Sequence, residues 1–347
     1  MVNLAEGVAR RGYPVDLVLA KAKGPYLEQV AETVRVVDLN AYRCAASLPG
    51  LARYLVRERP GAMLSVTSGA NVVALLARRL VGLPSRLVVN EQNTLSQWVN
   101  RSSNWRIRLT PRLVKYSYRW ANAVVAVSHG VADDLIATWR IPADRVEVIY
   151  NAGVTPQLRR KALAQVDHPW LDSGQPPLVL AVGSLTVQKD FGTLLRAFAK
   201  VRANRPARLM ILGEGRERPR LEESVRALGL EEDVQLPGWI DNPYAYMTRA
   251  SVFTLSSRWE GLPTVLVEAL YCGARVVATD CPNGPREILK NGEYGRLVPV
   301  GDVDELARAI AMSIGGNAPP APRESWQPYD VDNIVGKYVD LLFGRAG

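Results

Sequence analysis

Short apolar runs alternate with amphipathic stretches along almost the whole chain. In the first half the apolar runs are VDLVLA, VRVVDL, AMLSV, RLVVN, AVVAVS and VEVIY, and residues with the apolar spacing of helices lie between them, as at 48–59 and 71–81. Runs of this length and β-branched content, separated by helical stretches, are typical of parallel strands covered by helices. The pattern predicts an α/β fold.

The pattern restarts after SGQPP with LVLAVGS, ARLMILGEG, DVQLPGW, SVFTLSS, ARVVATD and GRLVPV. A Pro- and Gly-bearing connection between two strand-helix series indicates a domain boundary. We therefore expect two Rossmann-like, doubly wound domains facing a cleft, with 1–155 as the first domain, 156–176 as a linker and 177–325 as the second. Residues 326–347 should form a C-terminal helix that packs back toward the first domain. Ligands of such sheets bind at the carboxyl ends of the strands.

The first residues, MVNLAEGVARRG, have a helical pattern. A doubly wound domain normally begins with a strand and a glycine-rich turn before its first helix. We expect that this first strand and its glycine-rich loop are missing from the N-domain; the alternative is an unusual but complete domain.

Composition narrows the class of protein. Of the 347 residues, 48% are hydrophobic and 22% are charged, which is typical of a globular chain, and the formal net charge of +9 implies an anionic partner. No signal peptide or membrane-spanning run is evident, so a cytoplasmic protein is expected. Three scattered cysteines and two histidines provide no metal-binding spacing, and we expect no bound metal and no cofactor.

The stretch SSRWEGLPTVLVEALYCGARVVATD contains the most informative chemistry. An apolar strand leads into RWEGLP, and a helix is expected from Thr264 to Cys272, with its unpaired N-terminal amides available to an anion. Glu260 precedes this helix, and Glu268 lies within it among apolar residues, where a carboxylate needs hydrogen-bond partners such as a sugar diol. Two glutamates alone are more often a surface loop residue and a solvated helix charge.

Three further strand ends carry glycine turns. AVGSLTVQKDF places Lys189 just before a helix, where its ammonium can contact a diphosphate; LMILGEG and LPGWIDN supply the other two turns. Four such ends converging at one sheet edge indicate a nucleotide-sugar site.

The second half resembles the family 4 retaining glycosyltransferases of two-Rossmann-domain (GT-B) architecture, of the bacterial glycan-assembly type. Their E-x7-E signature is matched by Glu260 to Glu268, and VGSLTVQKDF, LGEG, SSRWEGLPTVLVEAL and CPNGPREIL followed by GRLVPVGD are further matches. The first half is similar more loosely, through LAEGVARRGYPVDLVL and AVVAVSHGVADDL. The resemblance implies transfer of a hexose from a nucleotide-sugar without a bound metal.

The resemblance also implies roles for individual residues. Glu260 and Lys189 would be catalytic, with Glu268 on the ribose diol and Lys189 on the diphosphate. The residues expected to bind the donor are Gly183, Ser184, Lys189, Gly213, Glu214, Gly238, Trp239, Glu260, Gly261, Leu262, Pro263, Thr264, Val265 and Glu268.

Two departures from the family pattern matter. Ser184 stands where many relatives carry arginine, so neutralisation of the diphosphate would depend on Lys189 alone. Where many relatives carry a histidine, this chain reads VVNEQNTLSQ. Glu91, Gln92 and Asn93 are therefore the candidates on the acceptor side.

The segment from Trp98 to Trp120 interleaves arginines and lysines with tryptophans and tyrosines. Such a mixture suits an anionic membrane surface, and it also suits nucleic acid or an ordinary helix with basic stems over the core edge. No nucleic-acid-binding motif accompanies it, so we expect no nucleic acid and favour peripheral contact with the inner face of the membrane.

The predicted function is that of a retaining, metal-independent glycosyltransferase. It would move a hexose or N-acetylhexosamine from a nucleotide-sugar, most simply a UDP-sugar, to a glycan or lipid-linked saccharide. The alternative is an N-terminally truncated, inactive scaffold that binds the donor. An epimerase would require an acid/base pair that the sequence does not offer.

Overall fold

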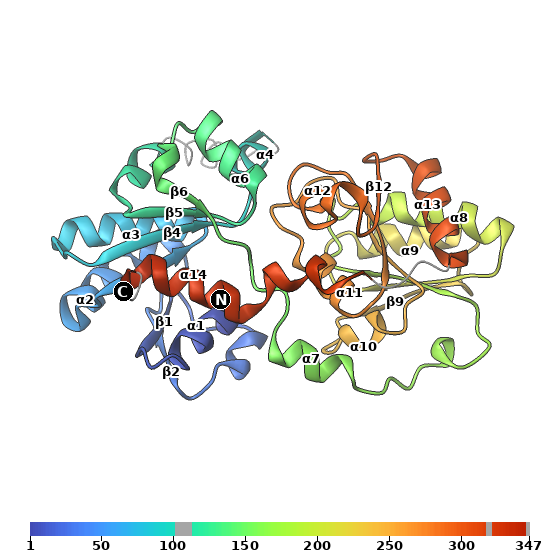
Figure 1. The fold of residues 1–347 in the computed structure, drawn as a ribbon, viewed down its shortest axis with the longest axis horizontal. Coiled ribbons are helices and arrows are strands. Elements are labelled where there is room, and N and C mark those ends of the chain that lie inside the picture. The colour runs from blue at the N-terminus through green and yellow to red at the C-terminus, as the bar shows by residue number, and fades with distance from the viewer. Residues whose placement is uncertain (101–112, 317–320, 345–347) are drawn as a thin grey trace. The chain divides into compact units, whose positions relative to one another are not determined.

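The computed structural model of the protein describes residues 1–100, 113–316 and 321–344. The chain divides into two compact units, which are treated separately below (Figure 1). Unit 1 comprises Met1–Ala152 and Val331–Gly347, and unit 2 comprises Gly153–Asp330. No helix among the described residues is long and apolar enough to span a bilayer.

Unit 1 is built on two parallel sheets, one of β1 and β2 and one in the order β3-β4-β5-β6. Its strands are β1 (Val15–Leu19), β2 (Val34–Asp38), β3 (Ala62–Val66), β4 (Arg86–Glu91), β5 (Ala123–Ala126) and β6 (Val146–Val148). Its α-helices are α1 (Val2–Ala9), α2 (Leu48–Glu58), α3 (Ser68–Val81), α4 (Leu95–Asn100), α6 (His129–Asp133) and α14 (Val331–Phe343).

The C-terminal helix α14 completes the core of unit 1. Val335 and Tyr338 are almost fully buried there against α1, β4 and β5. The Tyr338 hydroxyl accepts a hydrogen bond of 2.5 Å from the Asn90 amide nitrogen. The last helix of the chain thus packs with its first helix and with strands made more than 200 residues earlier.

Unit 2 is a single parallel sheet in the order β12-β11-β10-β7-β8-β9 with helices on both faces. Its strands are β7 (Leu178–Val182), β8 (Arg208–Leu212), β9 (Val234–Gly238), β10 (Val252–Leu255), β11 (Arg275–Thr279) and β12 (Arg296–Val298). Its α-helices are α7 (Pro156–Ala162), α8 (Phe191–Asn204), α9 (Arg218–Ala227), α10 (Tyr244–Met247), α11 (Thr264–Tyr271), α12 (Pro285–Ile288) and α13 (Val303–Gly315).

Helix α8 shows why this sequence folds as it does. Its buried apolar residues recur at the three- and four-residue spacing that places them on one helix face. They are Phe191, Leu194, Leu195, Ala197, Phe198 and Val201. This face packs into the core of unit 2 beside α13, and so fixes the turn between β7 and α8 at one end of the sheet.

The stretch 156–176, expected to be a linker, belongs to unit 2 and is partly helical. Thr155 caps α7 by accepting a hydrogen bond of 3.1 Å from the Leu158 amide, and Leu158 is fully buried. The buried leucine explains why this stretch packs on the unit.

The chain passes from unit 1 to unit 2 after Ala152 and returns after Asp330. The two passages lie side by side, because Val154 and Asp330 form a parallel β-bridge. The Gly153 amide donates to the Tyr329 carbonyl at 3.0 Å. Two segments of chain, hydrogen-bonded to each other, therefore connect the two units.

Candidate active site

The carboxyl ends of the parallel strands of unit 2 lie along one sheet edge. Gly183 follows β7 and Gly213 follows β8, and the Gly183 amide donates to the Leu212 carbonyl at 2.9 Å. Gly213 has φ +141°, and a Cβ there would lie 2.1 Å from the Gly183 carbonyl oxygen. Only glycine at position 213 allows these two turns to touch.

The turns after β8 and β9 carry a carboxylate that is already in an ion pair and an exposed aromatic ring. Gly238 ends β9 with φ +90°, and the Trp239 side chain after it is 60% exposed. Glu214 is held by Arg218, with 2.5 Å between Oε1 and Nη2, and this guanidinium holds the pKa of the Glu214 carboxyl below its usual value. Trp239 offers a stacking face, whereas Glu214 is already paired.

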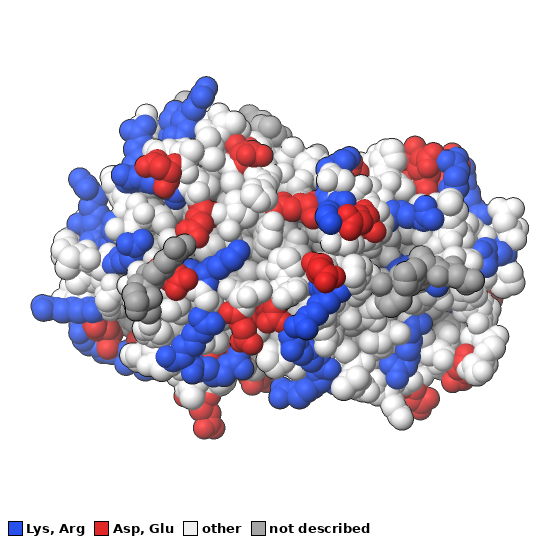
Figure 2. All heavy atoms as spheres, viewed as in Figure 1, with Lys and Arg blue, Asp and Glu red and all other residues white. Residues whose placement is uncertain are grey.

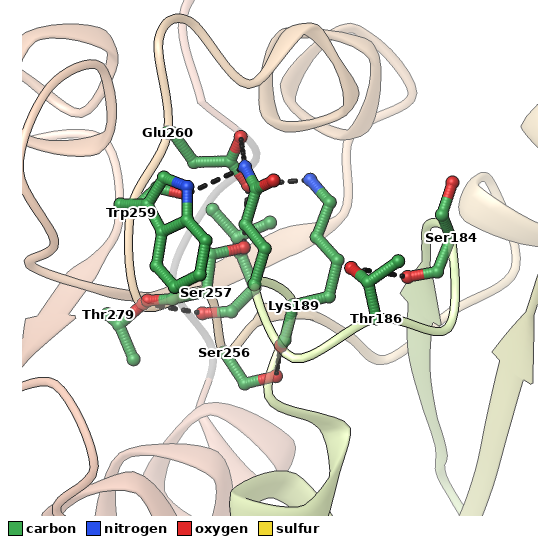
Figure 3. Close-up of polar contacts among 10 residues, drawn as sticks. Ser184, Thr186, Lys189, Ser256, Ser257, Trp259, Glu260 and Thr279 are labelled. Carbon is green, nitrogen blue, oxygen red and sulfur yellow. Dashed lines mark hydrogen bonds and ion pairs between the residues drawn. The ribbon is translucent and has the colours of Figure 1, made fainter. Parts of the chain in front are cut away.

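The centre of the site is an ion pair between Lys189 and Glu260 (Figure 3). The Lys189 Nζ lies 2.6 Å from Glu260 Oε1, and the Glu260 side chain is only 7% exposed. The Ser257 hydroxyl donates to the same oxygen at 2.6 Å, and the Gln188 amide approaches Oε2 at 3.4 Å. Glu260 is therefore a buried, hydrogen-bonded carboxylate and not the exposed loop residue that the sequence first suggests.

A second ion pair holds the Lys189 loop against the Glu260 loop. The Arg258 Nε donates to Asp190 Oδ2 at 2.8 Å, and the Ser256 hydroxyl donates to the Lys189 carbonyl at 2.7 Å. Asp190 adopts φ +48° at the start of α8 and is buried. These contacts fix the backbone positions from which Lys189 and Glu260 meet.

Helix α11 begins next to this pair. Its N-cap residue is Pro263, and no side chain caps the helix, so the first-turn amides of Thr264 and Val265 are placed as donors for a ligand. Gly284 has φ +91°, and a Cβ there would lie 2.4 Å from Pro263 Cδ. The turn through Gly261 and Leu262 is thus packed directly on the Gly284 backbone.

Glu268 lies one turn into α11 and is half-buried. Its carboxylate forms no hydrogen bond or ion pair within the described part of the chain. Burial alone raises the pKa of its carboxyl to about 7. A half-buried carboxylate with no partner is stabilised when a ligand supplies hydroxyl donors.

Ser184 lies on the exposed turn after β7, near Lys189 in Figure 3. The Thr186 hydroxyl donates to its carbonyl at 3.4 Å. A Cβ on Gly183 would lie 3.3 Å from the Lys189 Cε, so the lysine stem runs over this turn. The structure thus brings the turn, Lys189 and Glu260 together.

The acceptor-side candidates lie in unit 1 and differ in exposure. Glu91, at the end of β4, is buried; it accepts hydrogen bonds from Tyr118 at 2.7 Å and Ser68 at 2.9 Å, and burial raises its pKa to about 7. Gln92 exchanges hydrogen bonds with Asn151, the shorter being 2.7 Å. Asn93 is exposed. Of these three candidates, Gln92 and Asn93 are therefore open to solvent.

Sequence reasoning missed Ser257, Gln188 and the Arg258–Asp190 pair. The Gln188–Glu260 and Arg258–Asp190 contacts join residues about 70 positions apart, and no local motif marks them. The Ser257 hydroxyl contacts Glu260 three positions away, but a lone serine beside a glutamate carries no sequence signal. Most of the basic and aromatic segment lies outside the described residues, since 101–112 are not among them.

Two family models match the chain. The model described as "Glycosyl transferase 4-like domain" matches residues 1–152, and the model described as "Glycosyl transferases group 1" matches 176–314. The chain therefore belongs to the family of two-domain α/β glycosyltransferases that these two models describe.

Two bacterial glycosyltransferases are among the relatives of the chain. The chain is 32% identical over 240 residues to the N-acetylgalactosamine-N,N'-diacetylbacillosaminyl-diphospho-undecaprenol 4-alpha-N-acetylgalactosaminyltransferase of Campylobacter jejuni, covering 69% of this chain and 63% of that one. It is 29% identical to the amylovoran biosynthesis glycosyltransferase AmsD of Erwinia amylovora, covering 84% of this chain and 79% of that one. The Campylobacter match thus spans less than two thirds of that relative's length.

Solved structures share the fold. Sucrose-phosphate synthase from Thermosynechococcus elongatus is 22% identical with a TM-score of 0.79, covering 97% of this chain and 90% of its own. HepE from Anabaena, solved with UDP and glucose, is also 22% identical with a TM-score of 0.79, covering 98% and 95%. These likenesses show the two-domain GT-B fold.

Proposed function

We propose that this chain transfers a hexose or N-acetylhexosamine from a UDP-sugar to a glycan or lipid-linked saccharide, with retention of configuration. The observation that carries the proposal is the arrangement around α11, in which a buried Lys189–Glu260 pair and an unpartnered Glu268 flank an uncapped helix N-terminus. Ammonium, helix amides and a half-buried carboxylate match a diphosphate and a diol.

In this proposal Glu268 accepts hydrogen bonds from the ribose diol of the donor. Its carboxylate is held among apolar neighbours such as Leu266 and Val267, which are buried. Because the carboxylate has no partner among the described residues, the gain from a bidentate diol is not offset by loss of an existing bond. Trp239, at the neighbouring strand end, supports the base by stacking.

Lys189 and Glu260 would act as a pair that opens toward the donor. The ammonium can turn from the Glu260 oxygen to the diphosphate, while Ser257 and Gln188 remain as partners of that carboxylate. The positive charge of Lys189 and the α11 amides then stabilises the departing diphosphate. No metal ion is required in this account, because these groups supply the positive charge.

In the transfer step the donor's own leaving group accepts the proton of the acceptor hydroxyl. The bond from the sugar C1 to the diphosphate oxygen breaks, the acceptor hydroxyl forms a bond to C1 on the same face, and its proton passes to the diphosphate. Glu260 lies near the transferred sugar in this account and binds it.

Two comparisons support the substrate classes. The Campylobacter relative is named for transfer to a diphospho-undecaprenol-linked saccharide, and the HepE structures contain UDP, glucose or UDP-glucose. By analogy, we extend a lipid-linked or glycan acceptor and a UDP-sugar donor to this chain.

Calorimetric titration with UDP and a panel of UDP-hexoses and GDP-mannose tests the donor site. Glu268→Ala should weaken binding of the preferred donor by roughly tenfold or more, since a hydrogen bond to a charged group contributes about 1.5–3 kcal/mol. Glu223→Ala is the matched control, because Glu223 is an exposed carboxylate of α9 in the same unit. Equal binding by both variants would refute the assigned role.

Contact with an anionic membrane surface is a further part of the proposal. It rests on the net charge of +9 and on the basic and aromatic residues from Trp98 to Trp120. On the face drawn in Figure 2, lysines and arginines are interspersed with acidic and uncharged residues, so that face presents no uniform basic surface.

Flotation with liposomes tests this contact. We expect the protein to float with vesicles containing about a third anionic lipid and to remain unbound with neutral ones, and to dissociate at high salt because the screening length shortens. Equal recovery with both kinds of vesicle would contradict an electrostatic membrane contact.

A further inference from the structure

The turn that follows β4 in unit 1 is held from inside by one buried carboxylate. Glu91 is the last residue of β4, and only 1% of it is exposed. Its carboxylate accepts hydrogen bonds from the backbone amides of Gln92 and Asn93, the next two residues. Hydrogen bonds from main-chain amides to a charged carboxylate are strong, so they fix the backbone of the turn. Glu91 therefore shapes the turn without reaching solvent itself.

Two other elements hold this carboxylate in place. The hydroxyl of Ser68, the first residue of α3, lies 2.9 and 3.0 Å from its two oxygens. The Tyr118 hydroxyl donates to Oε2 at 2.7 Å and accepts from the Asn71 amide nitrogen at 2.8 Å. Tyr118 and Asn71 are both fully buried. The position of the Glu91 carboxylate is thus determined by uncharged donors on α3 and on the segment before β5.

Backbone strain at the end of β3 places Ser68. Thr67, between β3 and α3, has φ +77°, a conformation that is rare for a β-branched residue. Its amide donates to the Asn90 carbonyl at 3.2 Å, and its carbonyl accepts from the Asn71 amide at 2.8 Å. Such strain persists where surrounding contacts impose it, and it is common at binding sites. The strain and the network lie at the carboxyl ends of β3 and β4, where ligands of parallel sheets bind.

The turn carries two amide side chains, and they differ in what they contact. The Gln92 amide forms hydrogen bonds with Asn90 and Asn151, including one of 2.7 Å from Asn151. Asn93 is exposed, and its side chain has no hydrogen-bond partner among the described residues. A carboxamide both donates and accepts and carries no charge. It therefore matches the hydroxyl and acetamido groups of a neutral sugar.

We propose that the Asn93 side chain contacts the terminal sugar of the acceptor, and that Glu91 is the positioning residue that holds Asn93 in place. The inference rests on the proposed function and adds to it that this terminal unit is a neutral sugar. Glu91 makes no contact with substrate. Its carboxylate acts through the main chain of the turn, so its loss would misplace Asn93 and leave the donor site in unit 2 unchanged.

Acceptor kinetics test the contact, with octyl glycosides as probes. The probes carry glucose, galactose, N-acetylglucosamine or N-acetylgalactosamine, and release of nucleoside diphosphate from the preferred donor measures transfer. Asn93→Ala should raise the KM for the best glycoside by roughly five- to tenfold, because one hydrogen-bonded contact is lost. The dissociation constant of the donor, measured by calorimetry, should stay within about twofold.

Glu91→Gln and Tyr118→Phe test the positioning role. Each should raise the same KM by about fivefold or more, since each weakens the hydrogen bonds that hold the turn. Neither should add to the effect of Asn93→Ala in a double variant, because residues that act through one contact are not additive. Tyr118→Phe keeps the ring and so retains the test if Glu91→Gln fails to fold. Glu147→Gln is the matched control, because Glu147 is an exposed carboxylate of β6 in the same unit.

Three outcomes would overturn the inference while the proposed function stands. An unchanged KM in Asn93→Ala would remove the contact, and additive effects in the double variants would make Glu91 and Tyr118 merely structural. Donor binding without transfer to any of the four glycosides would refute a neutral terminal sugar. If the unmodified protein binds no nucleotide-sugar, the proposed function itself fails and the inference falls with it.

Discussion

At the scale of single residues, the site combines one paired and one unpaired carboxylate. Glu260 is neutralised by Lys189 and bonded by Ser257, whereas Glu268 has no partner within the described residues and a pKa raised by burial to about 7. A buried carboxylate that lacks partners costs stability in the folded state. The unpaired Glu268 carboxylate therefore lowers the stability of unit 2 at the position where a diol would bind.

This cost predicts a pH dependence of stability. Because the pKa of Glu268 is raised to about 7 in the folded state from an ordinary 4.5, the side chain costs little below pH 4.5. It destabilises the fold increasingly as pH rises from 4.5 to about 7, and the cost is constant above that. Glu268→Gln removes this ionisation. The difference in free energy of unfolding, variant minus unmodified protein, should therefore increase by about 1–3 kcal/mol between pH 4.5 and 7.5.

Urea unfolding at a series of pH values, without donor, measures this difference. Glu91 also has a pKa raised to about 7, but it titrates in both proteins and cancels in the comparison. A difference that stays constant across this pH range would show that Glu268 is not desolvated as described.

At the scale of elements, the sequence predicted the strands and the glycine turns well because both have local causes. The apolar runs fix the strands, and positive-φ glycines such as Gly213 and Gly238 mark the turns. The Arg258–Asp190 and Lys189–Glu260 pairs could not be predicted from spacing, because each joins residues about 70 positions apart. Likewise, the buried side chain of Leu158 packs the helix at 156–162, the first part of the expected linker, onto unit 2.

The contact between two glycine turns gives a prediction for the sheet edge. Gly213→Ala would place a Cβ 2.1 Å from the Gly183 carbonyl oxygen, so the turns after β7 and β8 must separate. We expect a loss of more than about 3 kcal/mol in the free energy of unfolding, together with loss of UDP-sugar binding.

Gly229→Ala is the control for this substitution. Gly229 also has positive φ, at +64°, but a Cβ there meets nothing within 4 Å, so the cost is limited to about 1–2 kcal/mol of backbone strain. Chemical denaturation and calorimetric titration of both variants make the comparison. Equal losses would mean that φ alone, and not the contact of the turns, determines the effect.

At the scale of the whole molecule, unit 1 is discontinuous in sequence. Helix α14, made last, provides Val331, Ile334, Val335 and Tyr338 to its core. A Cβ on Gly7 of α1 would lie 2.3 Å from Val335 Cγ2, so these two helices are in close contact. Sequence pattern predicted a C-terminal helix, but only the packing shows which strands it covers.

Truncation after Asp330 tests this dependence. Removing α14 should expose the core side of β4 and β5, and their amides should exchange rapidly, while the amides of β7 and β8 in unit 2 keep their protection. Truncation after Gly344 leaves α14 intact and should change neither unit. Unaltered protection of β4 and β5 in the shorter chain would show that α14 is dispensable.

The two passages of chain at the junction also impose an order on biosynthesis. Unit 1 is the first to leave the ribosome, but it cannot be finished until α14 follows all 178 residues of unit 2, from Gly153 to Asp330. At about 5–20 residues per second, unit 2 takes roughly 9–36 s to synthesise. During that interval the apolar face awaiting α14 is uncovered, so nascent unit 1 is a natural client for chaperones, while unit 2 can fold as soon as it emerges.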